Sequence, residues 1–514
     1  MSKTIIIIGA GLAGLSAALQ AAENGCNVKL VSSLPSERAQ SVMAEGGINA
    51  ALNTKDENDS PEEHFTDTIK AACGLADPNA VWGMTQAAPE LVHWLLKLGV
   101  KFNMSGYDDV DLRNFGGQKK KRTAFAQSDT GKQIMTAMID AVRRKEASGM
   151  VERFSHHSFL TLRLCGNICC GCVIRDEYSQ ETVELPGDAV IVATGGMHGL
   201  FGNTTGSLSN TGEVTAELFR LGVPLANGEM IQYHPTTVKC GGKRMLISEA
   251  ARGEGGRVFA MKDGKQWYFM EEKYPELGNL MPRDITAREI WKVSHESEVF
   301  LDMTEISEEI ISNKLSGLAD DCMTYLHKDI RKEPVSVLPG IHYFMGGILV
   351  DEQHRTPIQN LCAAGECCAQ YHGANRLGGN SLLGALYGGR VAAKSACEQA
   401  DVVDLSCATQ IDFPPASQIS EIKQLNKVMQ ETMGVVRNEN TLLNGIQTVQ
   451  ALTGNLPLLG MAVLKSALAR KESRGAHWRE DYPKSNDNDY LKTTVARFDG
   501  KQIQISFVPV PERR

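Results

Sequence analysis

The sequence predicts an α/β fold with a Rossmann-like domain whose strands come from widely separated parts of the chain. The first observation is an apolar, β-branched run that leads through closely spaced glycines into a helical segment within residues 3–33. The second and third are two later apolar segments that again run into glycine, "DAVIVATGG" (188–196) and "NLCAAGECC" (360–368). Buried parallel strands have this continuous apolar character. Because both late segments repeat one N-terminal pattern, we expect a bipartite domain.

The N-terminal segment predicts a nucleotide site. Ile5–Ile8 is the expected strand, and Gly9, Gly11 and Gly14 follow at G-x-G-x-x-G spacing before the helix. These glycines allow a tight turn, close approach of a pyrophosphate and close helix–strand packing, with the phosphates at the helix N-terminus. The next strand ends at Ser32, where an acidic residue would normally hold the ribose. A serine hydroxyl can still hydrogen-bond a ribose hydroxyl, only less strongly.

Composition narrows the class of protein. The chain has 514 residues, is 42% hydrophobic and 22% charged, and carries a formal charge of −8, so it is globular and has no basic footprint for nucleic acid. Thirteen cysteines in a chain of this length favour mostly reduced thiols and a cytoplasmic protein over a secreted disulfide framework. The sequence has no apolar run near the 18 or so residues of a membrane span. We therefore expect no direct membrane span, and attachment at a membrane only through a partner.

Histidines and arginines flanked by Gly or Pro recur through the middle of the chain. Taken singly, a histidine is more often structural, and a Glu–Arg pair is more often a surface ion pair. Taken together they suit a small dicarboxylate, because each buried carboxylate needs charged or polar donors. The residues are His234 in "IQYHPTT", Glu249 and Arg252 in "LISEAARGEGG", Arg283 in "MPRDITAREI", His342 in "PGIHYFMGGI" and Arg376 in "YHGANRLGGNS".

The motifs "HPT", "SEAARGEGG", "PRD", "HYFMGGI" and "HGANRLGGNSLL" occur in this order. With them the chain resembles the flavoprotein subunits of fumarate reductase and succinate dehydrogenase, and their relative L-aspartate oxidase, from residue 1 to about residue 495. The resemblance implies a bipartite FAD-binding domain, an inserted α+β capping domain and a C-terminal helical domain, to which "MGVVRNE" and "RKESRGAHWREDYP" belong. The expected ranges are 1–230 and 346–410 for the FAD-binding domain, 231–345 for the capping domain, and 411–514 for the helical domain and tail.

The resemblance also implies roles for the polar residues. His234 and His342 would bind one carboxylate of the substrate and Arg376 the other, and the Ser248 hydroxyl would add a hydrogen bond. Reduced flavin N5 would deliver hydride to one alkene carbon, and Arg283 would deliver the proton to the other. Glu249 and Arg252 would relay protons to Arg283. Residues implied to hold FAD are Gly9, Gly11, Gly14, Ser32, Ala44, Gly46, Gly47, Thr194, Gly195, Glu213, Glu366, Asn380, Ser381, Leu382 and Leu383.

Two departures from the family pattern affect these expectations. In membrane-bound relatives a histidine just before "AEGG" attaches FAD covalently, whereas "RAQSVMAEGG" has Gln40 there. The resemblance therefore implies non-covalent FAD, which favours fumarate reduction over succinate oxidation. The stretch "RTAFAQSDTG" (122–131), which lines the substrate region in relatives, also departs from the pattern, with Gln127 and Ser128. The exact unsaturated acid, the direction in the cell and the oligomeric state stay open.

Three alternatives remain beside fumarate/succinate chemistry: L-aspartate oxidase, a reductase of a related enoate, and a non-catalytic FAD-carrying subunit. "RLGGNSLLGALYGGR" and "HWREDYP" favour the fumarate/succinate assignment over aspartate oxidase, and the intact Arg283 argues against the non-catalytic one. "CGNICCGC" (165–172) has cysteines dense enough for a metal cluster but lies in a β-rich stretch, so we expect a structural role. The resemblance implies a separate iron–sulfur subunit as electron donor.

Overall fold

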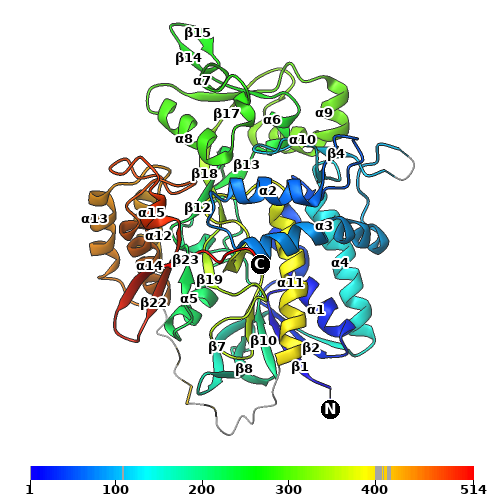
Figure 1. The fold of residues 1–514 in the computed structure, drawn as a ribbon, viewed down its shortest axis with the longest axis vertical. Helices are drawn as coiled ribbons and strands as arrows, with labels where there is room; N and C mark the ends of the chain where they lie inside the picture. The colour runs from blue at the N-terminus through cyan, green and yellow to red at the C-terminus, as the bar shows by residue number, and fades with distance from the viewer. Residues whose placement is uncertain (1, 107–108, 400–407, 409, 412, 414–417) are drawn as a thin grey trace.

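A computed structural model describes residues 2–514 apart from 107–108, 400–407, 409, 412 and 414–417. Three regions can be followed by colour in Figure 1. The blue and cyan N-terminal segments surround a sheet at the lower right, the green middle of the chain forms the top, and orange to red helices form the left side. The yellow helix α11 (Asn380–Gln399) returns to the N-terminal region beside α1 (Leu12–Glu23).

The central sheet has five parallel strands in the order β20-β10-β1-β2-β6. Because side chains alternate along a strand, Ile5 and Ile7 pack with the core of α1, α4 (Thr130–Ala147) and α11. Ile6 and Ile8 face β8 (Ile168–Asp176) and α5 (Glu213–Arg220) on the other side. The two late strands predicted from sequence are β10 and β20, and both join the N-terminal strand pair. The strands are β1 (Thr4–Ile8), β2 (Asn27–Ser32), β6 (Val151–Ser155), β10 (Ala189–Val192) and β20 (Leu361–Ala363).

Helices cover one face of this sheet and a three-stranded antiparallel sheet lies against the other. The helices on the first face are α1, α3 (Pro78–Leu98), α4 (Thr130–Ala147) and α11, with α2 (Pro61–Ala71) packed on α3. The strands on the second face are β7 (His157–Cys165), β8 (Ile168–Asp176) and β9 (Thr182–Pro186), beside α5 (Glu213–Arg220). A small sheet is built from β3 (Ile48–Asn49), β4 (Leu112–Arg113) and β5 (Thr123–Ala124).

The middle of the chain forms two antiparallel sheets and short helices. The first expected boundary, residue 231, is where β12 begins, and the second, residue 345, directly follows β18. One sheet contains β12 (Ile231–Cys240), β13 (Lys243–Leu246) and β18 (Leu338–Phe344), and the other β14 (Arg257–Lys262), β15 (Lys265–Trp267), β16 (Val299–Asp302) and β17 (Val335–Ser336). The helices are α6 (Glu249–Gly253), α7 (Phe269–Lys273), α8 (Arg283–Val293), α9 (Glu308–Lys314) and α10 (Ser316–Asp321).

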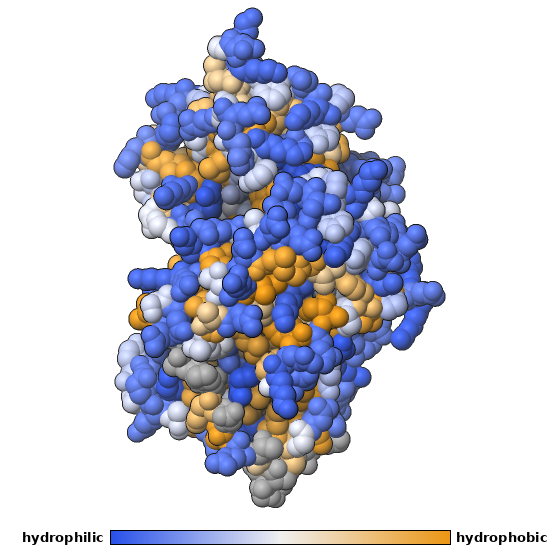
Figure 2. All heavy atoms as spheres, turned by 90° about the vertical axis from the view of Figure 1, so that its left-hand side faces the viewer, coloured by the Kyte–Doolittle hydropathy of each residue, from blue (hydrophilic) through white to orange (hydrophobic). Residues whose placement is uncertain are grey.

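The C-terminal region is helical, as expected, but its tail is not. After α12 (Ile419–Thr432), α13 (Glu439–Val449), α14 (Asn455–Ala469) and α15 (Asp487–Tyr490), the chain forms a hairpin of β22 (Lys492–Phe498) and β23 (Ile503–Pro509). This hairpin pairs with β11 (Leu225–Ala226), in a sheet that continues through β19 (Gly347–Leu349) to β21 (Cys368–Ala369). Figure 2 shows the side of the molecule on which these helices lie, with apolar residues gathered across its middle and smaller apolar areas above and below among polar residues.

The α/β architecture with a Rossmann-like bipartite sheet is confirmed, because strands before residue 9 and after residue 360 lie in one parallel sheet. The expected boundary at 410/411 lies beside residues outside the described part of the chain. Among the described residues, the structure contains no helix with the length and hydrophobicity of a membrane span.

Candidate active site

A cavity of about 550 Å³ runs between the carboxyl edge of the parallel sheet and the middle region of the chain. Its walls come from the ends of β1, β2 and β10, from the starts of α1 and α11, and from β12 and β18. Ligands bind at this edge in open parallel sheets. We call the part beside β1 and β2 the nucleotide end, and the part beside β12, β18 and α8 the substrate end.

The nucleotide end is shaped by glycines. A Cβ on Gly9 would lie 2.2 Å from the carbonyl oxygen of Ala193, and one on Gly14 would lie 1.8 Å from that of Gly9. The turn between β1 and α1 therefore excludes any side chain at these two positions. Gly11 differs, because a Cβ there would meet protein atoms only at 3.6 Å or more. At this position the glycine leaves space that a bound group can occupy.

A polar atom at the end of β2 also fits a bound nucleotide. The Ser32 hydroxyl oxygen is buried, lines the cavity and has no hydrogen-bond partner among the described residues. Buried polar groups are normally hydrogen-bonded, so an unpaired one in a cavity wall fits a ligand group. A ribose hydroxyl would satisfy it, as the sequence predicts. Together with the glycine turn, Ser32 makes the nucleotide end fit FAD.

Most of the residues implied to hold FAD line this one cavity. Three of them do not: Gly14 packs against Gly9, Leu383 belongs to the core, and the Asn380 side chain bonds Asn49, His64 and Thr68. Their contribution would be to hold the backbone of the two helix starts. The residues that line the cavity are Gly9, Gly11, Ser32, Ala44, Gly46, Gly47, Thr194, Gly195, Glu213, Glu366, Ser381 and Leu382.

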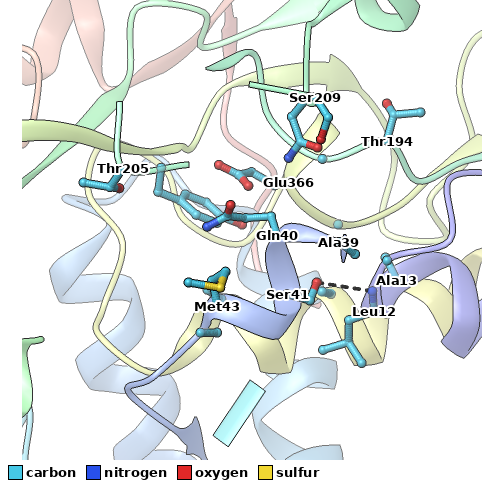
Figure 3. Close-up of a pocket in the computed structure, with 18 of the residues that line it drawn as sticks. Leu12, Ala13, Ala39, Gln40, Ser41, Met43, Thr194, Thr205, Ser209 and Glu366 are labelled. Carbon is cyan, nitrogen blue, oxygen red and sulfur yellow. Dashed lines mark hydrogen bonds between the residues drawn. The ribbon is translucent and has the colours of Figure 1, made fainter. Parts of the chain in front are cut away.

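Gln40 begins a 3-10 helix (Gln40–Met43) and lines the cavity. Figure 3 shows it among Glu366, Thr205 and Ser209, with Ser41 accepting a hydrogen bond from the backbone of Leu12. The Gln40 side-chain oxygen accepts a hydrogen bond of 2.6 Å from the Ser207 amide. The carboxamide nitrogen of Gln40 is not nucleophilic, because its lone pair is delocalised into the carbonyl group.

At the substrate end, one carboxylate lies between two guanidinium groups. Arg283 donates from Nε and Nη2 to Glu249 Oε2 at 2.8 and 2.6 Å, and Arg252 Nη2 lies 3.3 Å from Glu249 Oε1. Glu249 also accepts from the Gly116 amide at 3.1 Å. Burial alone would raise the pKa of Glu249, but the two arginines lower it below its ordinary value. Glu249 is therefore ionised at neutral pH, whereas Arg252 lies behind it and off the cavity wall.

Arg376 is a buried cation on the wall of the cavity. Within the part of the chain that the structure describes, its Nε atom has no hydrogen-bond partner, and its guanidinium lies 4.3 Å from the ring centre of Tyr343. Burial, with Arg283 nearby, lowers the pKa of Arg376 to about 9. Such a cation is stabilised by an anion, which could accept from its unpaired donor. Glu249 bonds Arg252 and Arg283, and Glu366 is the other carboxylate near Arg376. Two carboxylates thus face three guanidinium groups, so this end of the cavity keeps an excess of positive charge that suits an anion.

Two histidines stand beside these cations. The rings of His234 and His342 are 5.2 Å apart, both line the cavity, and Nδ1 of His342 lies 2.8 Å from the Thr205 hydroxyl. Burial, followed by the charge of Arg283, lowers the pKa of both rings well below 6.5, so they are neutral at pH 7. Ser248 lies on the same wall and its hydroxyl caps α6 by accepting from the Ala250 amide.

Three residues of the substrate end were not predicted from sequence. Gln232 accepts from Arg283 Nη1 at 3.1 Å and donates to the Arg376 carbonyl at 2.8 Å, which ties the two cations together. Its position two residues before His234 on β12 is a signal that could have identified it, because side chains two apart share a face. Thr205 contacts His342, and Tyr343 contacts Arg376. No sequence pattern predicts either role.

The cysteine-rich stretch lies away from this cavity. Cys165 ends β7, and Cys169, Cys170 and Cys172 are buried free thiols in β8. In the described residues no group of three or more His, Cys, Asp or Glu side chains is arranged to hold a metal ion.

Family models match two parts of the chain. An FAD binding domain model matches residues 4–382, and a fumarate reductase flavoprotein C-terminal model matches residues 452–513. Among curated relatives, the succinate dehydrogenase flavoprotein subunit of Bacillus subtilis (strain 168) is 38% identical, with 100% of this chain and 98% of the relative covered. The 8-methylmenaquinol:fumarate reductase flavoprotein subunit of Wolinella succinogenes is 32% identical, with 100% and 92% covered.

Solved structures agree with these matches. The FrdA chain of a quinol fumarate reductase variant from E. coli superposes with a TM-score of 0.90 at 27% identity, covering 99% of this chain and 97% of that one. Mycobacterium smegmatis Sdh1, in complex with UQ1, has a TM-score of 0.83 at 28% identity, with 100% and 95% covered. The chain therefore belongs to the succinate dehydrogenase/fumarate reductase flavoprotein family and is an FAD-dependent oxidoreductase of that type.

Proposed function

We propose that the protein interconverts fumarate and succinate and favours fumarate reduction. The observation that supports this most directly is the substrate end of the cavity, where the buried Arg376 has an unpaired donor beside Arg283, His234 and His342. Arg376 would bind one carboxylate of the substrate, and the two neutral histidines with Ser248 would bind the other. FAD held at the nucleotide end would supply the hydride chemistry.

Arg283 is the proposed proton donor. It lines the cavity, and its Nε and Nη2 atoms are held by Glu249, so the guanidinium plane is fixed before substrate arrives. After Arg283 gives a proton to the substrate carbon, Glu249 and Arg252 would return one along their contacts of 2.6 and 3.3 Å. A fixed donor of this kind supplies orientation as well as charge.

We propose that FAD is bound without a covalent link, because Gln40 has no nucleophilic imidazole and its side-chain oxygen is bonded to the Ser207 amide. Acid precipitation should leave the flavin in the supernatant. Yellow colour that stayed with the denatured protein would contradict non-covalent binding.

We also propose that a separate iron–sulfur subunit delivers the electrons, and that any attachment of this cytoplasmic chain to a membrane is through such a partner. The relatives named above are called flavoprotein subunits, which supports an assembly. Metal analysis of the purified chain alone should find no stoichiometric iron. Iron that co-purified with the chain would overturn the proposal and would make Cys165–Cys172 the candidate ligands of that iron.

The assay that tests the function is oxidation of reduced viologen by purified holoprotein with fumarate and with a panel of other unsaturated dicarboxylates. Dye reduction with succinate and with L-aspartate, measured on the same preparation, tests the direction and the aspartate oxidase alternative. Fumarate should be reduced faster than succinate is oxidised, and L-aspartate should give no turnover. Turnover of another enoate without fumarate activity would replace the proposed substrate.

A further inference from the structure

Two cysteines far apart in sequence meet where α1 and α11 end, on the side of these helices that is remote from the cavity. The sulfur atoms of Cys26 and Cys397 are 3.1 Å apart, although the residues are separated by 371 positions. Cys26 follows α1, and Cys397 lies in the last turn of α11. Both are free thiols. A disulfide bond is about 2.05 Å long, so the sulfurs need to approach by roughly 1 Å to bond.

The helices that carry this pair are packed tightly along their length. The Ser16 hydroxyl of α1 donates to the Leu386 carbonyl of α11 at 2.7 Å, and a Cβ on Gly389 would lie 2.3 Å from the Ala13 carbonyl oxygen. Beside the pair, the Lys3 ammonium group donates to the Cys397 carbonyl at 2.7 Å. Close packing on both sides keeps the two sulfurs together while the protein is folded.

We propose that Cys26 and Cys397 form a reversible disulfide when the protein meets a peroxide. The peroxide oxidises one thiol to a sulfenic acid and releases one water; the other thiol attacks the sulfenic sulfur, the S–O bond breaks, and a second water leaves as the S–S bond forms. The two thiols supply the two electrons that reduce the peroxide. Cys397 is the expected site of first attack, because it is half-buried whereas Cys26 is only 5% exposed.

The rate should depend on pH in a defined direction. Burial, with Cys26 adjacent, raises the pKa of the Cys397 thiol to about 12. The thiolate is the reactive form, so oxidation at pH 7 is slow and accelerates as the pH rises. A hydrogen bond with the Asn24 side chain and the charge of Lys3 partly oppose this rise in the pKa of Cys397.

The bond would change how firmly α1 and α11 are held together beside the nucleotide end of the cavity. The N-termini of α1 and α11 both line the cavity through Leu12 and Ser381, and the disulfide would join the opposite ends of these helices. A cross-link between residues this far apart in sequence restricts the unfolded chain strongly, so the melting temperature should rise. Flavin should also leave the oxidised protein more slowly, because separation of the two helices is blocked.

The experiment uses the wild-type holoprotein with hydrogen peroxide as the probe, at pH 7 and pH 9. Remaining thiols are alkylated, and non-reducing peptide mapping identifies linked peptides. We expect a Cys26–Cys397 linkage that dithiothreitol reverses, faster formation at pH 9, and a rise in melting temperature. Cys397→Ser and Cys26→Ser should show neither the linkage nor the rise, and Cys73→Ser, which removes a half-exposed thiol elsewhere, should show both.

Two results would overturn the proposal. One is full alkylation of both Cys26 and Cys397 after other thiols of the protein have been oxidised. The other is a peroxide-dependent rise in melting temperature that is as large in Cys397→Ser as in the wild type, which would assign the stabilisation to another site. Neither readout requires catalytic turnover, so the proposal stands or falls independently of the fumarate assignment.

Discussion

At the nucleotide end of the cavity, tightly packed glycines set the shape of the wall, whereas at the substrate end charged side chains hold one another. Gly9 and Gly14 leave no room even for a methyl group. Arg283, Glu249 and Arg252 are instead fixed by hydrogen bonds and charge. Binding at the nucleotide end should therefore be sensitive to side-chain volume and insensitive to pH. Binding at the substrate end should be sensitive to pH and insensitive to side-chain volume. Under the proposed function, shape would hold the cofactor, and electrostatics would hold and protonate the substrate.

The strongest test of the substrate end is Arg283→Lys. Lysine keeps the charge but loses the planar fork that bonds Glu249 through two nitrogens. General acid catalysis contributes about 10²–10⁴-fold, so kcat and kcat/KM for fumarate should fall together by at least that order. FAD content should be unchanged, because Arg283 is remote from the glycine turn. Near-normal turnover would require a different acid or a different substrate.

The nucleotide end is tested by a matched pair of changes. Gly14→Ala places a methyl group against the Gly9 carbonyl, so both FAD content and stability should fall. Gly11→Ala meets no protein atom closer than 3.6 Å, so the apoprotein should keep its melting temperature while FAD binding weakens. Flavin absorbance and apoprotein melting measure the two effects separately. If Gly11→Ala bound FAD normally, the cofactor would not approach that glycine.

Arg376→Ala should weaken substrate binding more than catalysis. A hydrogen bond to a charged group is worth about 1.5–3 kcal/mol, which corresponds to a rise in KM for fumarate of roughly 10- to 150-fold. Steady-state kinetics on preparations of equal FAD content provide the measurement. An unchanged KM would exclude Arg376 as the carboxylate ligand, and the unpaired Nε atom would need another explanation.

Stability should fall as the pH drops below about 6.5, because buried histidines must then become protonated. One of them is His372, which lies off the cavity wall and packs against the Tyr343 ring. Burial and Arg376 hold the pKa of His372 well below 6.5. Below pH 6.5 this histidine is therefore protonated in the unfolded chain while it is still neutral in the folded protein. Each such histidine costs about 1.4 kcal/mol per pH unit between its unfolded and folded pKa values. Urea unfolding of the holoprotein at pH 7, 6 and 5.5 should show this loss, with a smaller slope in His372→Gln. A stability that stayed flat over this range would contradict the neutral, buried state.

The smallest expected effect concerns the support of Arg376. The Tyr343 ring lies 4.3 Å from its guanidinium, and cation–π contacts are worth about 0.5–2 kcal/mol. Tyr343→Leu should raise KM for fumarate several-fold, while Tyr343→Phe, which keeps the ring, should remain close to wild type. Equal KM values for the two variants would show that the ring face does not position Arg376.

The sequence predicts those features that depend on residues close together in the chain. The β1–α1 turn was predicted because glycine spacing and an adjacent apolar run are enough to define it. Glu249 and Arg252 are three residues apart, a spacing that predicts one side of a turn or helix, and they share α6. The wider set of substrate-end residues came from motif resemblance, since no spacing argument joins β12, α8, β18 and the loop before α11.

The features that the sequence alone does not predict depend on contacts between segments that are far apart in the chain. Gln232 matters because it reaches both Arg283 and the Arg376 carbonyl, and neither partner is near it in sequence. The C-terminal hairpin carries a local signal, Asp499–Gly500 between two β-rich runs. Its attachment to β11, more than 250 residues earlier, carries none. Local patterns thus indicate elements, and only the fold shows which of them meet.

The order of strands in the parallel sheet has a consequence for how the protein is made. Strand β20 pairs with β10, so the sheet that begins at residue 4 gains its edge strand only when residue 363 has been synthesised. The ribosome must then add α11 before the second wall of the FAD site exists. Contacts between such distant segments slow folding and leave apolar strands exposed during synthesis. We therefore expect flavin to enter late, onto a nearly complete chain, and flavin-starved cells to accumulate a species prone to aggregation and proteolysis.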